Sequence, residues 1–197
     1  MSTCHSLPKV SVSPGFLLLA AFLFYLDDGS GILLWAVAAA IFHELGHVIA
    51  SILMGGRVER LTLSAAGAEL RFAYSAVLSY GRECLVALSG PAVNLIVGVP
   101  LYAAGLYLPA MISFGLGFFN LLPVLPLDGG RVLYGLTAVR FGPDHAEQML
   151  AVSAGIVAGL LAGLGAIAAA EYANVMPLML AIWLLFGAMK KEKNIPK

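Results

Sequence analysis

The chain has 197 residues, of which 60% are hydrophobic and only 11% charged, and its formal net charge at pH 7 is zero. Soluble domains carry about 25% charged residues, so this composition excludes an ordinary soluble protein and favours one embedded in a membrane. A neutral chain without a basic stripe also argues against a nucleic-acid partner.

Six apolar runs approach the length of about 20 residues that a helix needs to cross a bilayer. They cover residues 10–26, 31–55, 84–108, 110–127, 149–170 and 175–189. The first and the last are short, and prolines interrupt the fourth. The N-terminus lacks the features of a removable signal peptide, so the first run is expected to stay as a span. We expect an all-α polytopic membrane protein with about six transmembrane helices.

Residues 56–83 form the one sizeable polar segment between these runs. Apolar and polar residues alternate over 61–64 and 68–72, with Gly67 between them, which predicts a small β-hairpin at the membrane surface. An isolated hairpin is marginal in water, so it must lean on the helices or the bilayer. Its edge could accept a substrate strand, or the segment could be a surface loop with no partner.

The basic residues predict the orientation. With six spans, all eleven Lys and Arg residues fall on one side, while the opposite loops carry only Asp27, Asp28 and Glu171. Positive charge collects on the cytoplasmic side, so both termini are expected in the cytoplasm of a multi-pass cell-membrane protein. Glycines repeat every four residues at 155, 159 and 163, which favours close packing within the bundle or in a homo-oligomer.

The second run contains His43-Glu44-Leu45-Gly46-His47. On a helix, positions i and i+4 share a face, so His43 and His47 can bind one metal ion. Glu44 is placed to reach a water beside that metal. Ionisable groups are costly among lipid tails, so a cluster of them inside a span is functional by default.

A catalytic zinc site usually has three protein ligands. Asp128 is the candidate for the third, because it borders the fourth run behind Pro123 and Pro126. Prolines interrupt a regular helix, so a bent chain can return Asp128 to the depth of the histidines. From the residues alone, an ordinary Asp-Gly turn at the membrane surface is the alternative.

Three motifs together resemble the site-2 protease family of intramembrane zinc metalloproteases. His43 to His47 matches the family's HExxH, the segment from Asn120 to Gly130 matches its Asn, proline and DG signature, and the segment from Ser89 to Asn94 resembles its SGPxxN element. They lie in the family's order across residues 41–130.

The resemblance implies one Zn²⁺ per chain held by His43, His47 and Asp128, with Glu44 as the catalytic acid/base. It also implies cleavage of a transmembrane protein substrate near the cytoplasmic end of its span, with the active site toward the cytoplasm. The six-span plan resembles the compact branch that includes the sporulation-factor proteases. We expect a single peptidase domain over residues 1–197, with a catalytic core at about 31–140.

The oxyanion formed during peptide hydrolysis needs a hydrogen-bond donor besides the metal. Asn120 is the first candidate and Asn94 the second, although either could be an amide that packs helices. His145 is expected to be a solvated loop residue, not a fourth ligand.

Two other classes compete with a protease. A metal or ion transporter would place ionisable groups along a route through both leaflets, and the outer halves of these runs contain none. An inactive scaffold that binds membrane partners is the other alternative, although all the metal-binding and acid/base positions are present.

Overall fold

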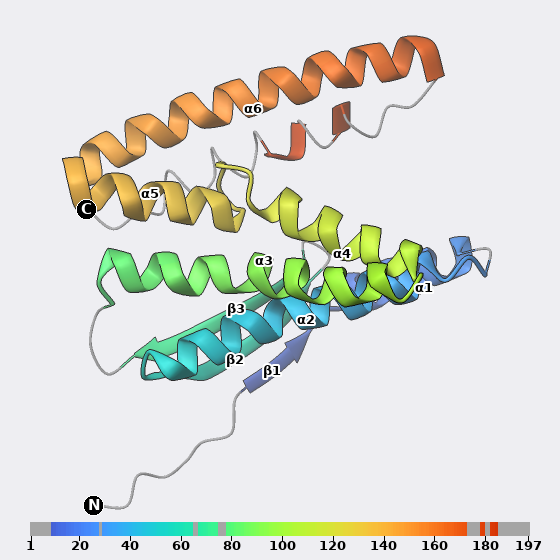
Figure 1. The fold of residues 1–197 in the computed structure, drawn as a ribbon, viewed down its shortest axis with the longest axis horizontal. Helices are drawn as coiled ribbons and strands as arrows, with labels where there is room; N and C mark the ends of the chain where they lie inside the picture. Colours follow the sequence, from blue (N-terminus) through green and yellow to red (C-terminus); the bar gives the residue numbers. More distant parts are fainter. Residues whose placement is uncertain are drawn as a thin grey trace, which may run out of the picture. The chain divides into compact units, whose positions relative to one another are not determined.

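The computed structural model describes residues 9–27, 29–64, 67–74, 78–172, 178–179 and 182–184, and most of them are helical (Figure 1). The elements in chain order are β1 (Lys9–Val12), α1 (Pro14–Leu26), α2 (Ile32–Leu53), β2 (Gly56–Ser64), β3 (Gly67–Tyr74), α3 (Tyr80–Ala103), α4 (Tyr107–Asn120), α5 (Asp128–Phe141) and α6 (Pro143–Tyr172).

Three helices in this part of the chain are long and apolar enough to cross a membrane. They are Ile32–Leu53, Tyr80–Ala103 and the stretch Pro143–Glu171 of α6. They correspond to the second, third and fifth runs of the sequence analysis. By contrast, α1 has 13 residues and α4 has 14. At about 1.5 Å per residue, helices of this length span roughly 20 Å, which is less than the hydrocarbon thickness.

The chain divides into two compact units. Unit 1 contains Met1–Leu78 and Ala92–Leu116, and unit 2 contains Ser79–Pro91 and Gly117–Lys197. Helices α3 and α4 therefore each contribute one part to unit 1 and the other part to unit 2.

Unit 1 contains a three-stranded sheet in the order β1-β2-β3. Strand β2 pairs antiparallel with β3, with Gly56 opposite Tyr74 and Ser64 opposite Gly67. Strand β1 pairs parallel with β2, and Ser11 Oγ donates a hydrogen bond to Thr62 Oγ1 at 3.3 Å. Helices α1 and α2 both contact β2 (Figure 1).

The prediction of one continuous span over residues 10–26 was wrong at its start, because Lys9–Val12 is a strand. Val10 and Val12 alternate with Ser11, which is the period of a strand. Pro14 then occupies the first position of α1, where its missing N–H costs no helical hydrogen bond.

Helix α2 buries its small and polar residues and exposes its large apolar ones. Ala39, His43, Gly46, His47 and Ser51 are buried at helical spacing. The exposed positions include Ile41, Leu45, Ile49 and Ile52. A soluble helix shows the opposite distribution, so this pattern is that of a helix surrounded by lipid.

Unit 2 is built around the turn that joins α4 to α5. Val124 and Leu127 of this turn belong to a buried apolar cluster with Ala154, Val157 and Leu184. Ser153 Oγ, on α6, donates a hydrogen bond of 2.6 Å to the carbonyl oxygen of Pro123. Helix α6 also packs against α5 (Figure 1). Helix α6 therefore holds the turn in two ways: by packing against its apolar side chains and by a hydrogen bond to its backbone.

The turn lies directly against the first residues of α5. A Cβ atom on Gly129 would collide with the backbone carbonyl groups of Leu121 and Leu122. A Cβ on Gly130 would collide with the backbone of Val124 and Leu125. Only glycine allows the backbone to approach this closely, so both glycines are needed for the fold of the turn.

The fourth apolar run, 110–127, is not one helix, because α4 ends at Asn120 and residues 121–127 form the turn. Helix α5 was not predicted, because the sequence showed no apolar run between residues 127 and 149. Of the sixth run, 175–189, only residues 178–179 and 182–184 lie within the described residues. His145 was predicted to be a solvated loop residue; it is exposed, but it lies on α6.

Gly129→Ala is expected to lower the free energy of unfolding by about 1–3 kcal/mol, the usual cost of overpacking a tight site. Gly159→Ala on α6 is the matched control, because nothing lies within 4 Å of a Cβ at that position. The measurement is the Tm of the purified variants in detergent. Equal Tm values for the two variants would contradict the close approach at Gly129.

Candidate metal centre

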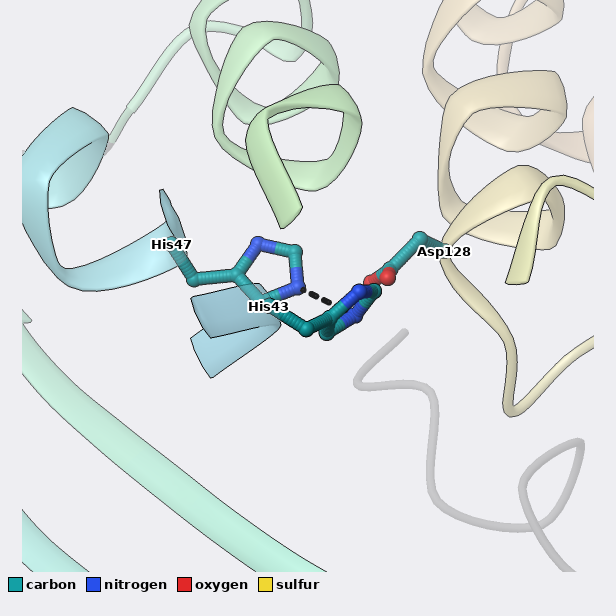
Figure 2. Close-up of side chains that lie close together, drawn as sticks. All are labelled: His43, His47 and Asp128. Atoms are coloured by element: carbon teal, nitrogen blue, oxygen red, sulfur yellow. Dashed lines mark hydrogen bonds between the residues drawn. The ribbon is translucent and has the colours of Figure 1, made fainter. Parts of the chain in front are cut away.

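The two histidines of the HExxH segment meet on the buried face of α2. His43 is 6% exposed and His47 is 7% exposed. Their Nε2 atoms lie 3.2 Å apart, and the rings meet edge to face with centroids 4.8 Å apart (Figure 2). The helical i, i+4 spacing therefore directs both Nε2 atoms to one point, as the sequence predicted.

The distance between these nitrogens fits two ligands of one tetrahedral metal ion. Zinc binds imidazole nitrogen at about 2.0–2.1 Å, and a tetrahedral angle then separates two such nitrogens by roughly 3.3 Å. The observed 3.2 Å between the Nε2 atoms agrees with this value. Two neutral imidazoles could also share one hydrogen bond at this distance. Whether the pair is a metal site therefore depends on which other metal-ligand residues lie beside it.

The other ring nitrogen of His43 faces Asn94, which comes from α3. Asn94 Nδ2 lies 3.2 Å from His43 Nδ1, and Asn94 is 0% exposed. Ser113, on α4, donates a hydrogen bond of 2.8 Å to the backbone oxygen of Asn94. Three helices of unit 1 therefore meet at His43 through buried polar groups.

Asp128 is the first residue of α5 and is 7% exposed. The N-terminus of a helix carries partial positive charge, which stabilises a carboxylate there. Arg131, one turn further along α5, places Nη1 at 3.8 Å from Asp128 Oδ1. Its side chain is 47% exposed, so solvent weakens this pair. Asp128 thus lies in unit 2, and the turn after α4 sets its position.

His43, His47 and Asp128 are a buried group of three residues that could hold a metal ion (Figure 2). Two imidazoles and one carboxylate are a ligand set found in catalytic zinc sites, where a fourth position stays open. Neutral imidazole and carboxylate ligands suit zinc and other divalent transition metals, so the donor chemistry fits such an ion.

Three other residues were considered as candidates from the sequence: Glu44, Asn120 and His145. Glu44 is half-buried on α2, directly after His43. Asn120 is half-buried at the end of α4 and belongs to unit 2, as Asp128 does. His145 is exposed in the first turn of α6 and is not one of the three grouped residues.

Sequence reasoning missed two serines that support the site. Ser113 holds the backbone of Asn94, and Ser153 holds the turn that precedes Asp128. Each is a single hydroxyl inside an apolar run, and that isolation was the available signal.

Helices with apolar exposed faces and a buried group of metal-ligand residues define a multi-pass membrane protein of the metal-binding class. The sequence model of Peptidase family M50 matches residues 104–164. The solved structure of the Site-2 Protease from Methanocaldococcus jannaschii shares the fold, with a TM-score of 0.67 at 20% identity, over 98% of this chain and 94% of that chain.

Relatives of known name agree with this assignment. Zinc metalloprotease MJ0392 of Methanocaldococcus jannaschii is 24% identical over 82% of this chain and 51% of its own length. Stage IV sporulation protein FB of Bacillus subtilis is 26% identical over 90% of this chain and 62% of its own length. The chain therefore spans about half the length of several relatives that it matches. The chain is therefore similar to zinc metalloproteases of known name, and residues 104–164 match the model of peptidase family M50.

His47→Ala is expected to lower the divalent metal bound by purified protein from about one ion per chain to nearly none, because one of three ligands is lost. His145→Ala is the control, since it removes an exposed histidine outside the group. Metal content is measured by mass spectrometry after gel filtration. Retention of metal by the His47 variant would exclude the histidine pair as ligands.

Proposed function

We propose that this protein is an intramembrane zinc metalloprotease that hydrolyses peptide bonds within or near the transmembrane segment of a membrane-protein substrate. The observation that carries the proposal is the buried His43–His47 pair, with Glu44 beside it, on a helix that can cross a membrane. The motif supplies two metal ligands and one acid/base, and a peptidase needs both.

In this proposal His43, His47 and Asp128 hold one zinc ion. When bound, zinc supplies Lewis-acid chemistry, which makes water acidic enough to be a nucleophile at neutral pH. Burial supports this assignment, because all three side chains are nearly excluded from solvent and each needs a partner there.

Glu44 is the general acid/base. Its carboxylate accepts a proton from the attacking water and then donates that proton to the amine of the departing peptide. Its position one residue after His43, on the same helix, places it beside the ligands without making it a ligand.

Asn120 is proposed as the donor that stabilises the oxyanion of the tetrahedral intermediate. It is the last residue of α4, eight residues before Asp128, the first residue of α5. A fixed amide N–H near the reacting carbonyl stabilises developing negative charge without reorganisation of solvent.

The depth of the site agrees with a substrate cut near one end of its span. His47 precedes the end of α2 at Leu53 by six residues, or about 9 Å along a helix. A substrate helix hides its peptide bonds in its own hydrogen bonds, so it has to unwind locally before hydrolysis. Residues that weaken helices near the cut are expected to favour cleavage.

We further propose that the chain crosses the bilayer six times as a single peptidase domain, with both termini and the active site toward the cytoplasm. The distribution of Lys and Arg supports this orientation. The sheet of β1, β2 and β3 would then lie at the cytoplasmic membrane surface, where an outer strand can receive an unwound substrate. The partners are a transmembrane substrate and membrane lipid, and the exposed face of Gly155, Gly159 and Gly163 is available for a homo-oligomer.

Glu44→Gln is expected to keep zinc bound and to lower the cleavage rate by about 10²–10⁴-fold, since the amide cannot accept a proton. The assay follows a tagged single-span membrane protein, with Asn-Pro-Gly near the cytoplasmic end of its span, reconstituted with the enzyme in liposomes. Glu147→Gln, an exposed acid on α6, serves as the control. Cleavage by the Glu44 variant at the wild-type rate would refute the acid/base role, and absence of cleavage by the zinc-loaded wild type would favour a scaffold.

Single cysteines placed at Asp27 and Arg57, in a background with Cys4 and Cys84 replaced by serine, test the orientation. An impermeant maleimide added to intact cells should label the cysteine at position 27 and leave that at position 57 unlabelled until the cells are opened. The reverse pattern would overturn the proposed topology.

A further inference from the structure

The side-chain amide oxygen of Asn94 is buried beside His43 without a hydrogen bond from the described residues that would explain its position. Asn94 Nδ2 lies 3.2 Å from His43 Nδ1, whereas Asn94 Oδ1 is buried and has no hydrogen-bond partner in the part of the chain that the structure describes. A buried amide oxygen left without a donor costs about 1–3 kcal/mol. Such an atom calls for an explanation.

The chemistry of His43 decides which of the two amide atoms has to face its ring. A neutral imidazole carries one proton, and a ring whose Nε2 binds a metal must carry that proton on Nδ1. Nδ1 is then a donor, and the group facing it has to be an acceptor. An amide turned by 180° about its Cβ–Cγ bond keeps its shape and exchanges Oδ1 with Nδ2. The atom of Asn94 that now has no partner then becomes the acceptor that His43 needs.

We propose that Asn94 is a positioning residue for His43: its Oδ1 accepts the Nδ1–H of His43 and so fixes the tautomer and ring orientation that direct the Nε2 lone pair to the metal. This inference rests on the proposed function, because it assumes that His43 is a metal ligand. It also moves Asn94 away from the role of oxyanion donor, since its amide contacts the far side of the imidazole from Nε2.

The surroundings hold Asn94 firmly enough for this role. Ser113 is 1% exposed and donates to the backbone oxygen of Asn94 at 2.8 Å. One turn further along α3, Gly98 allows the ring of Phe114 to approach so closely that a Cβ would lie 2.5–2.9 Å from three ring carbons. Helices α3 and α4 are therefore in direct contact at this level, and an acceptor fixed in this way orients an imidazole better than a mobile one.

The test compares Asn94→Leu, which has a similar size and no acceptor, with Asn94→Asp, which has only acceptors. Zinc affinity is measured by competition with a chelator, and the visible spectrum of the cobalt-substituted protein reports the ligand geometry. Loss of a partner that orients a metal-bound histidine typically weakens metal binding 10–100-fold, so the Leu variant is expected to lose about that much affinity. The Asp variant is expected to bind zinc about as tightly as wild type and to keep its cobalt spectrum.

Ser89→Ala is the matched control, because it removes a hydroxyl from the same helix that donates to the carbonyl oxygen of Val86 at 2.6 Å. It should keep the wild-type affinity. If Asn94→Leu does not fold, Asn94→Ala replaces it, because the smaller side chain introduces no clash; circular dichroism and gel filtration check the fold of each variant.

Wild-type affinity and spectrum in the Leu or Ala variant would overturn the proposal. So would equal weakening in the Leu and Asp variants, because the effect would then come from packing. A variant that keeps zinc but loses cleavage would return Asn94 to the oxyanion role. Failure of the proposed function is a different result, since the wild type itself would then lack zinc or cleavage.

Discussion

Lipid cannot solvate a polar group, and this constraint determines how the chain arranges its buried histidines and aspartate. A charged residue at the centre of a bilayer costs about 2.5–3.5 kcal/mol on insertion scales, so each such group needs a partner from the protein. The Nε2 atoms of His43 and His47 face one another, and Nδ1 of His43 faces Asn94. Asp128 lies at the positive end of α5 beside Arg131. The buried face of α2 can carry polar side chains because each histidine there faces a polar partner.

The same constraint explains the prolines before Asp128. A turn within apolar surroundings exposes N–H and C=O groups that helices would satisfy internally. Pro123 and Pro126 have no N–H to satisfy. The N–H groups of Leu122, Val124 and Leu127 bond to carbonyls within the turn or at the end of α4, and Ser153 satisfies the carbonyl of Pro123. The turn is thus irregular in shape but well paired in its hydrogen bonds.

The sequence predicted the elements that follow a simple period and missed those that depend on tertiary contacts. The three long spans and the facing of His43 and His47 follow from apolar length and from the i, i+4 spacing. The strand Lys9–Val12 was missed because its pairing partner, β2, lies about fifty residues away. Helix α5 was missed because its glycines and mixed composition give no clear period, and the turn that packs on it makes those glycines necessary. The contact between Asn94 and His43 could not be predicted, since it requires the relative rotation of two helices.

The contacts of α6 bear on which fragments of this chain can be studied alone. The sequence suggested a core at about 31–140, a boundary that would remove α6 completely. Yet Ser153 holds the backbone at Pro123, and Ala154 and Val157 cover Val124 and Leu127. A fragment ending at residue 140 would leave the segment before Asp128 without its apolar cover. The minimal unit for expression or redesign therefore extends through α6, even though none of His43, His47 and Asp128 lies on that helix.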